Sequence, residues 1–130
     1  MNTLVNEILS FVFVNNEHTN DFSEFEWYHN FVNQVENWVN TNNVTDIEYT
    51  LDVESVNNIF ATEFLFELTY RPITLVDNYN KLEVLVDNVL QDNKTDVMFN
   101  EGLNANVYYN NEYFYFGSSG SFYVLIKSVN

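Results

Sequence analysis

The chain has no cysteine, so neither a disulfide framework nor a thiolate metal site is available to it. A protein without cysteine suits a reducing compartment, so we expect a cytoplasmic protein. No Lys or Arg precedes the apolar residues at the N-terminus, which argues against a secretory signal peptide. No apolar run approaches the ~20 residues that a membrane-spanning helix requires, so we expect no membrane role.

Positive charge is also scarce. Four Lys and Arg residues stand against 19 Asp and Glu, which gives a formal net charge of -15. All four bases (Arg71, Lys81, Lys94 and Lys127) follow residue 70, whereas the first 70 residues carry 12 acids. Direct binding to nucleic acid is therefore unfavourable, because affinity for a phosphate backbone depends on Lys and Arg.

The shortage of lysine has a further implication. The chain holds 23 Asn, 12 Phe and 9 Tyr, a profile that indicates an AT-rich coding sequence. The same bias should supply Lys, whose codons differ from those of Asn only at the third base, yet there are three. Selection for solubility alone is the simpler explanation of an acidic protein. The missing lysines favour instead selection for negative potential.

Signals of catalysis are few. His18 and His29 lie far apart with no ligand partner at metal spacing, and Gly117-Ser118-Ser119-Gly120 lacks the spacing of a nucleophile elbow. The sequence has no phosphate loop and no dinucleotide fingerprint. We predict a protein that is not an enzyme and that binds no metal and no cofactor.

The hydrophobic fraction of 46% is high enough for a folded core, and the length suits one domain spanning residues 1–130. Apolar residues at helical spacing predict helices over residues 2–14, 21–43 and 75–89, although residues 11–14 also fit a buried strand. Ser23 and Glu26 match a capping box for the second helix, and Thr74 or Asp77 is the expected cap of the third.

Alternating residues predict the strands, which we place at residues 46–53, 62–70, 97–99, 106–109, 112–116 and 121–127. The fold class predicted is α+β, with an antiparallel sheet of about five strands and two or three helices packed on one side. Four tyrosines are expected to form a second core layer under a helix, with a contact surface as the alternative. They are Tyr109, Tyr113, Tyr115 and Tyr123.

The segment DIEYTLDVES (residues 46–55) sets its acids on one face of a predicted strand, opposite Ile47, Tyr49 and Leu51. Side chains on one strand face recur about every 6.7 Å, and duplex DNA carries one charge per about 3.4 Å per strand. Neighbouring acids bring the charge density to a similar order. We interpret this set as an imitation of DNA phosphates that binds a basic partner; ordinary solvated carboxylates are the alternative. The set consists of Glu24, Glu26, Glu36, Glu48, Asp52, Glu54, Glu63 and Glu67.

A direct consequence concerns the three acids of this segment. Reversing Glu48, Asp52 and Glu54 to Lys is expected to abolish inhibition of the basic partner and to leave the fold intact.

In size, in the charge of residues 1–70, in the absence of cysteine and in its Asn, Phe and Tyr content, the chain resembles small acidic phage-encoded inhibitors of nucleic-acid enzymes. These include anti-CRISPR, antirestriction and DNA-glycosylase-inhibitor proteins, several of which imitate DNA. The resemblance rests on no aligned motif and carries over no functional residues. It implies a non-enzymatic inhibitor in the cytoplasm of a bacterial host cell, with a CRISPR effector nuclease as the first target and a restriction enzyme as the next.

Other functions remain open at this point. The chain also fits an immunity protein that neutralises a nuclease toxin, an inhibitor of a DNA-repair enzyme, a small carbohydrate-processing enzyme or a phage assembly protein. The sequence leaves open whether the chain forms a homodimer.

Overall fold

The computed structural model describes residues 3–12, 26–57, 71–90, 97–99, 105–118 and 122–129, and of residues 26–28, 57, 97–99, 105 and 118 it describes the backbone alone. The elements, in chain order, are α1 (Thr3–Val12), α2 (Glu26–Thr41), β1 (Ile47–Asp52), α3 (Val53–Asn57), β2 (Ile73–Val76), α5 (Tyr79–Leu90), β3 (Val97–Phe99), β4 (Ala105–Tyr109), β5 (Tyr113–Ser118) and β6 (Phe122–Ser128).

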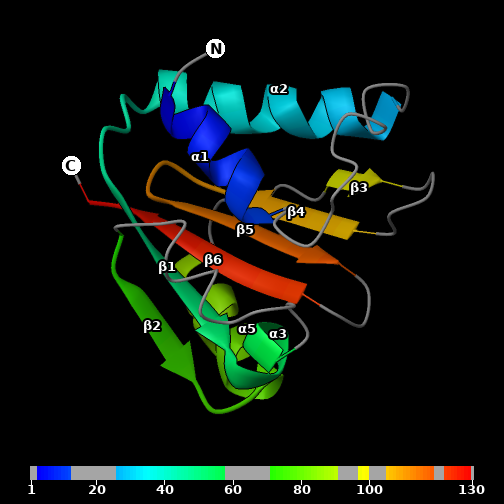
Figure 1. Ribbon diagram of the computed structural model, residues 1–130, viewed down its shortest axis with the longest axis vertical. Helices are drawn as coiled ribbons and strands as arrows, with labels where there is room; N and C mark the ends of the chain where they lie inside the picture. Colours follow the sequence, from blue (N-terminus) through cyan, green and yellow to red (C-terminus); the bar gives the residue numbers. More distant parts are fainter. Residues whose placement is uncertain are drawn as a thin grey trace.

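The strands form one sheet in the order β2-β1-β6-β5-β4-β3 (Figure 1). Every neighbouring pair is antiparallel except β1 and β2, which run parallel. The α+β class and the mostly antiparallel sheet are therefore confirmed. The sheet differs in detail from the prediction, because the described residues contribute six strands and one parallel pair.

One face of the sheet carries the larger core, which lies under α1 and α2 (Figure 1). Alternate residues of β1 and β6 meet there, with Tyr49 opposite Ile126 and Leu51 opposite Val124. To this core α1 contributes Phe11 and α2 contributes Trp38, both almost completely buried. Each lies on the apolar face of its own helix. Phe11 stacks on Tyr49 with ring centroids 3.9 Å apart.

The other face is covered by α5, through its buried residues Leu82, Val86 and Leu90. They pack against Tyr115 of β5 and Leu125 of β6. The prediction that the helices lie on one side of the sheet is therefore wrong. Its physical reason lies in β5 and β6, where Phe, Val and Ile alternate with Tyr and Leu, so that both faces are apolar and both need cover.

The tyrosine layer under a helix is confirmed for Tyr113, Tyr115 and Tyr123, which pack in the cluster of α5. Tyr109 instead packs against the core of α1 and α2. Along β4 the side chains alternate, and it is Tyr108 that faces α5.

The first helix is confirmed over Thr3–Val12, including Phe11 and Val12 of the four residues that also fitted a strand; residues 13 and 14 lie outside the described residues. The third helix begins later than predicted, because residues 73–76 form β2 parallel to β1. Its cap is Asn78, whose Oδ1 accepts the backbone N–H of Lys81 at 3.0 Å, and not Thr74 or Asp77. The predicted strand at 62–70 and the Ser23 of the capping box lie outside the described residues.

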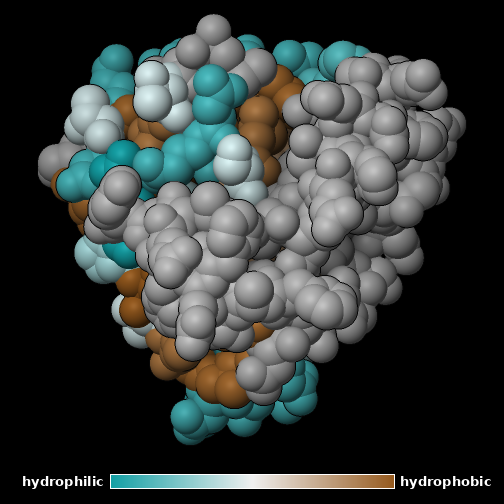
Figure 2. Space-filling view, in the orientation of Figure 1, coloured by the Kyte–Doolittle hydropathy of each residue, from teal (hydrophilic) through white to brown (hydrophobic). Residues whose placement is uncertain are grey.

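The surface view mixes polar and apolar residues. Figure 2 shows hydrophilic residues along the upper edge of this face and hydrophobic residues beside hydrophilic ones at its lower edge. The exposed large apolar side chains within the described ranges are Val53, Leu75 and Val84. No helix in the described part of the chain has the length and apolar character needed to cross a membrane.

Asn110 joins the two helical layers at the turn between β4 and β5. Its backbone oxygen accepts the indole N–H of Trp38 on α2 at 2.9 Å, and its side-chain amide donates to the carbonyl of Val89 on α5 at 2.8 Å. Its Oδ1 accepts the backbone N–H groups of Glu112 and Tyr113. One side chain therefore shapes the hairpin and holds α5 beside the sheet.

We predict that Asn110→Ala lowers the free energy of unfolding by about 2 kcal/mol, because it removes three side-chain hydrogen bonds. Urea denaturation followed by circular dichroism measures the change. Asn111→Ala is the matched control: its side chain is exposed at the neighbouring position, and the change there should be below about 0.5 kcal/mol. Equal effects of the two substitutions would contradict the role given to Asn110.

Candidate functional site: the acidic surface

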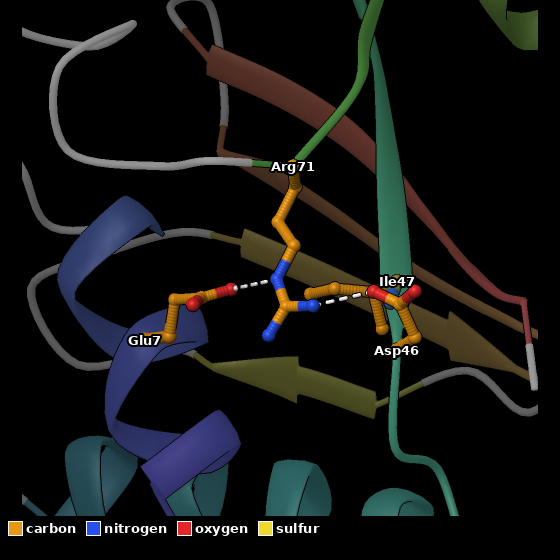
Figure 3. A network of polar contacts seen from close by, with 4 residues as sticks. All are labelled: Glu7, Asp46, Ile47 and Arg71. Atoms are coloured by element: carbon orange, nitrogen blue, oxygen red, sulfur yellow. Dashed lines mark hydrogen bonds and ion pairs between the residues drawn. The ribbon is translucent and has the colours of Figure 1, made fainter.

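Arg71 ties together carboxylates from two distant parts of the chain. Its Nε donates to Oε2 of Glu7 on α1 at 2.8 Å, and its Nη1 donates to Oδ1 of Asp46, just before β1 (Figure 3). The same Asp46 oxygen accepts the backbone N–H of Ile47 at 2.9 Å. The hydrogen bond to Glu7 is the main cause that raises the pKa of Arg71 above its ordinary value.

Tyr49 lies close enough to this network for the charges of Glu7 and Arg71 to act on its phenol. Burial is the main cause that raises the pKa of the Tyr49 phenol; the charge of Glu7 adds to the rise and that of Arg71 opposes it. The hydroxyl is buried and has no hydrogen-bond partner within the described residues. Tyr49 therefore remains a neutral core residue, and the network above it is a structural tie between α1 and the start of β1.

The line of acids predicted along β1 is not an open surface. Glu48, Thr50 and Asp52 do share one side of the strand, but that side is the one that α5 covers. Glu48 is half-buried and lies directly opposite Lys127 of β6. Opposite charges at directly paired positions attract, so Glu48 lies next to one of the few cations in the chain.

Asp52 is the clearest departure from the prediction, because its side chain is 0% exposed. Its Oδ1 accepts the hydroxyl of Ser55, which is also buried, and the Ser55 oxygen accepts the backbone N–H of Tyr123 at 2.9 Å. Asp52 Oδ2 has no hydrogen-bond partner in the described part of the chain. Asp52 links β1, α3 and β6 from the inside and cannot imitate a phosphate for an external partner.

The other predicted partner-binding residues fall into three groups. Glu54 is exposed in the first turn of α3, and Glu36 is half-buried on α2. Glu26 begins α2, but its side chain is not described. Glu24, Glu63 and Glu67 lie outside the described residues. The structure thus leaves Glu54 and Glu36 as surface carboxylates of the predicted set and places them on different elements.

Each described basic side chain lies beside a carboxylate of this chain. Besides Arg71, Lys81 donates to Asp77 at 2.5 Å and Lys127 lies 4.0 Å from Glu112. The hydrogen bond from Lys81 is the main cause that lowers the pKa of Asp77. By contrast, within the described ranges no cation contacts Glu36, Glu54 or Glu83. The charge left over at the surface is negative.

Sequence reasoning missed the carboxylates of α5. Glu83 and Asp87 are both exposed and stand one helical turn apart, on the outward face of the helix. The signal was present in the pattern, because both fall between the apolar positions that identify the helix. Restricting the acid count to the base-free first 70 residues left them out.

Histidine and metal chemistry find no support in the described ranges. His29 is exposed on α2, and His18 lies outside them. Nowhere in the residues that the structure describes do three or more His, Asp or Glu side chains come together as a metal site would require.

Comparisons with known proteins do not supply a family. Neither protein-family models, nor curated proteins, nor solved structures gave a match to this chain.

We predict that Asp52→Lys lowers the free energy of unfolding by about 3 kcal/mol or more, since it places an unpaired cation in a closed site. Glu54→Lys, two residues on and exposed, should cost about 1 kcal/mol or less. Urea denaturation of the two variants decides the point. Because Asp52 is buried, we no longer expect the fold to stay intact when Glu48, Asp52 and Glu54 are reversed together. Similar stability of both single variants would mean that Asp52 is open to solvent.

Proposed function

We propose that this protein is a non-enzymatic inhibitor that binds the basic groove of a nucleic-acid-binding defence protein, with a CRISPR effector nuclease as the first candidate and a restriction enzyme as the next. The observation that carries the proposal is the position of the basic side chains relative to the carboxylates. The described basic side chains lie beside carboxylates of the same chain, whereas Glu36, Glu54 and Glu83 contact none of them. With a net charge of -15, the exterior acts as a polyanion.

Electrostatic steering of such a polyanion toward a basic groove does not require its acids to form a single line. The long-range field depends on the summed charge, and association with a basic groove speeds up when the two potentials are complementary. The attraction to the partner therefore comes from the summed surface charge and not from the acids of β1. The inhibitor would act in the cytoplasm of a bacterial host cell, where such nucleases work.

Surface acids on different elements also support a second candidate, an immunity protein that neutralises a nuclease toxin. Glu36 belongs to the helix layer on one face of the sheet, and Glu83 belongs to α5 on the other. An immunity protein must fit one active site and not a long DNA path, so it needs no continuous row of charges. A toxin gene next to this gene would favour this candidate, and phage genes would favour the first.

The experiment measures displacement of DNA. A CRISPR effector nuclease loaded with guide RNA is mixed with fluorescent target duplex, and anisotropy follows release of the duplex as the protein is added. We predict competitive release by the unaltered protein. The triple variant Glu36→Gln, Glu54→Gln and Glu83→Gln should weaken it about tenfold, because three unit charges are removed.

Charge insertion is the matched control. Asn30 and Asn37 are exposed on α2, and changing both to Asp adds negative charge with little change of shape. That variant should displace DNA more strongly. Failure to release DNA from both a CRISPR effector nuclease and a restriction enzyme would overturn the proposal. Equal displacement by the neutralised and the charge-enriched variants would overturn its electrostatic basis.

A further inference from the structure

Four tyrosines meet on the α5 side of the sheet, and we call them the tyrosine cluster: Tyr79 of α5, Tyr108 of β4, Tyr115 of β5 and Tyr123 of β6. The rings of Tyr79 and Tyr123 have centroids 4.2 Å apart. Those of Tyr108 and Tyr115 lie 5.7 Å apart and within 6° of parallel. The cluster joins the start of α5 to β4, β5 and β6, which are neighbouring strands of the sheet.

The middle of the cluster is fixed by close packing. Tyr115 is 5% exposed, and its side chain is hydrogen-bonded to that of Tyr79. Gly117 leaves the room for this arrangement, since a Cβ at that position would come within 2.5 Å of the Tyr115 hydroxyl and 2.8 Å of the Tyr123 ring. The cluster therefore has a closely packed, buried member at its centre.

Three members reach the surface. Tyr79, Tyr108 and Tyr123 are half-buried, so part of each side chain is open to solvent. Burial is the main cause that raises the pKa of Tyr79, which keeps the phenol neutral. Tyrosine is one of the residues enriched in protein interfaces.

The border of the cluster is negative. Glu83 is exposed and lies four residues after Tyr79 on α5, the spacing that places two side chains on the same helix face. Its charge adds to the rise in the pKa of Tyr79 that burial mainly causes. Asp87 is exposed one turn further along α5. The nearest cation in the helix sequence, Lys81, is held by Asp77. Neutral rings and a carboxylate therefore stand side by side.

We propose that the tyrosine cluster and Glu83 form a docking surface for arginine side chains of the basic partner. A guanidinium is planar, stacks on aromatic faces and binds a carboxylate through two parallel hydrogen bonds. A lysine ammonium is a compact, strongly hydrated charge and gains less from the rings. Charge complementarity with a chain of net charge -15 favours a basic occupant, and the rings favour arginine among the basic residues. This inference rests on the proposed function, because it names the chemistry of the partner's contact.

The test uses two defined probes of equal charge, fluorescent octa-arginine and octa-lysine, titrated against the whole protein. Octa-arginine should bind about threefold or more tighter, as expected for cation–π contacts at partly exposed rings. The preference should persist as salt is raised, since salt screens charge attraction far more than ring stacking. Chemical shifts in the nuclear magnetic resonance spectrum should change at Tyr79 and Tyr123 with octa-arginine.

Substitutions separate the rings from the charge. Tyr79→Leu together with Tyr123→Leu should remove the preference for octa-arginine, and Glu83→Gln should reduce it. The matched controls are Tyr109→Leu, on the opposite face of the sheet, and Glu112→Gln, beside Lys127, and both should keep it. Folding of each variant is checked by circular dichroism and urea denaturation.

Equal affinity for the two peptides, or a preference that survives loss of both tyrosines, would overturn this inference and leave the proposed inhibition untouched. Conversely, the preference can hold while no nuclease is inhibited. That result would support the docking surface and reject the partner class.

Discussion

The structure depends on the pairing of β1 with β6 at the centre of a sheet that is covered on both faces. Tyr49, Leu51, Val124 and Ile126 put one set of side chains under α1 and α2, while Leu125 contacts the core of α5 on the other face. A strand in this position has no open face, so any acid in it must be paired or hydrogen-bonded. Asp52 meets that requirement through one carboxylate oxygen, which accepts the Ser55 hydroxyl. Glu48 is half-buried and stands at the position directly opposite Lys127.

Scarce cations serve the fold. Arg71 joins α1 to the start of β1, and the hydrogen bond from Tyr49 N–H to the carbonyl of Pro72 fixes β2 beside β1. Lys127 stands at the centre of the sheet, between Glu48 on β1 and Tyr113 on β5. Each of these cations offsets the carboxylate beside it, so the acids without a neighbouring cation set the sign of the exterior charge. Internal pairing and an anionic surface follow from the same composition.

The fold could be predicted from the sequence where one physical signal dominates. Alternation gave β1, β5 and β6, and helical spacing gave α1 and α2 with Phe31, Val35 and Trp38 inside. What local pattern could not provide was which face of a strand another element covers. The polar side of β1 looks solvent-facing in isolation, and only the packing of α5 on the same side reveals that Asp52 is closed off.

A similar limit applied to the shorter elements. The third helix was predicted to begin at residue 75, because Leu75 continues the spacing of Tyr79 and Leu82. In the structure, residues 73–76 instead form β2 by pairing with β1. Such pairing is a tertiary effect that overrides local preference. At the candidate site, the carboxylates of Glu54 and Glu36 could be found by sequence. The tyrosine cluster could be found only in part, because Tyr79 of α5 meets Tyr123 of β6 although the two residues are far apart in the sequence.

The central claim is that the anionic exterior is the functional part of the protein. The salt dependence of association tests this claim most directly. Stopped-flow measurement of binding to a guide-loaded CRISPR effector nuclease should show an association rate constant that falls about tenfold or more between roughly 0.05 and 0.5 M salt. The dissociation rate constant should change far less. An association rate that stays constant over this range would contradict the claim, because binding would then owe nothing to long-range attraction.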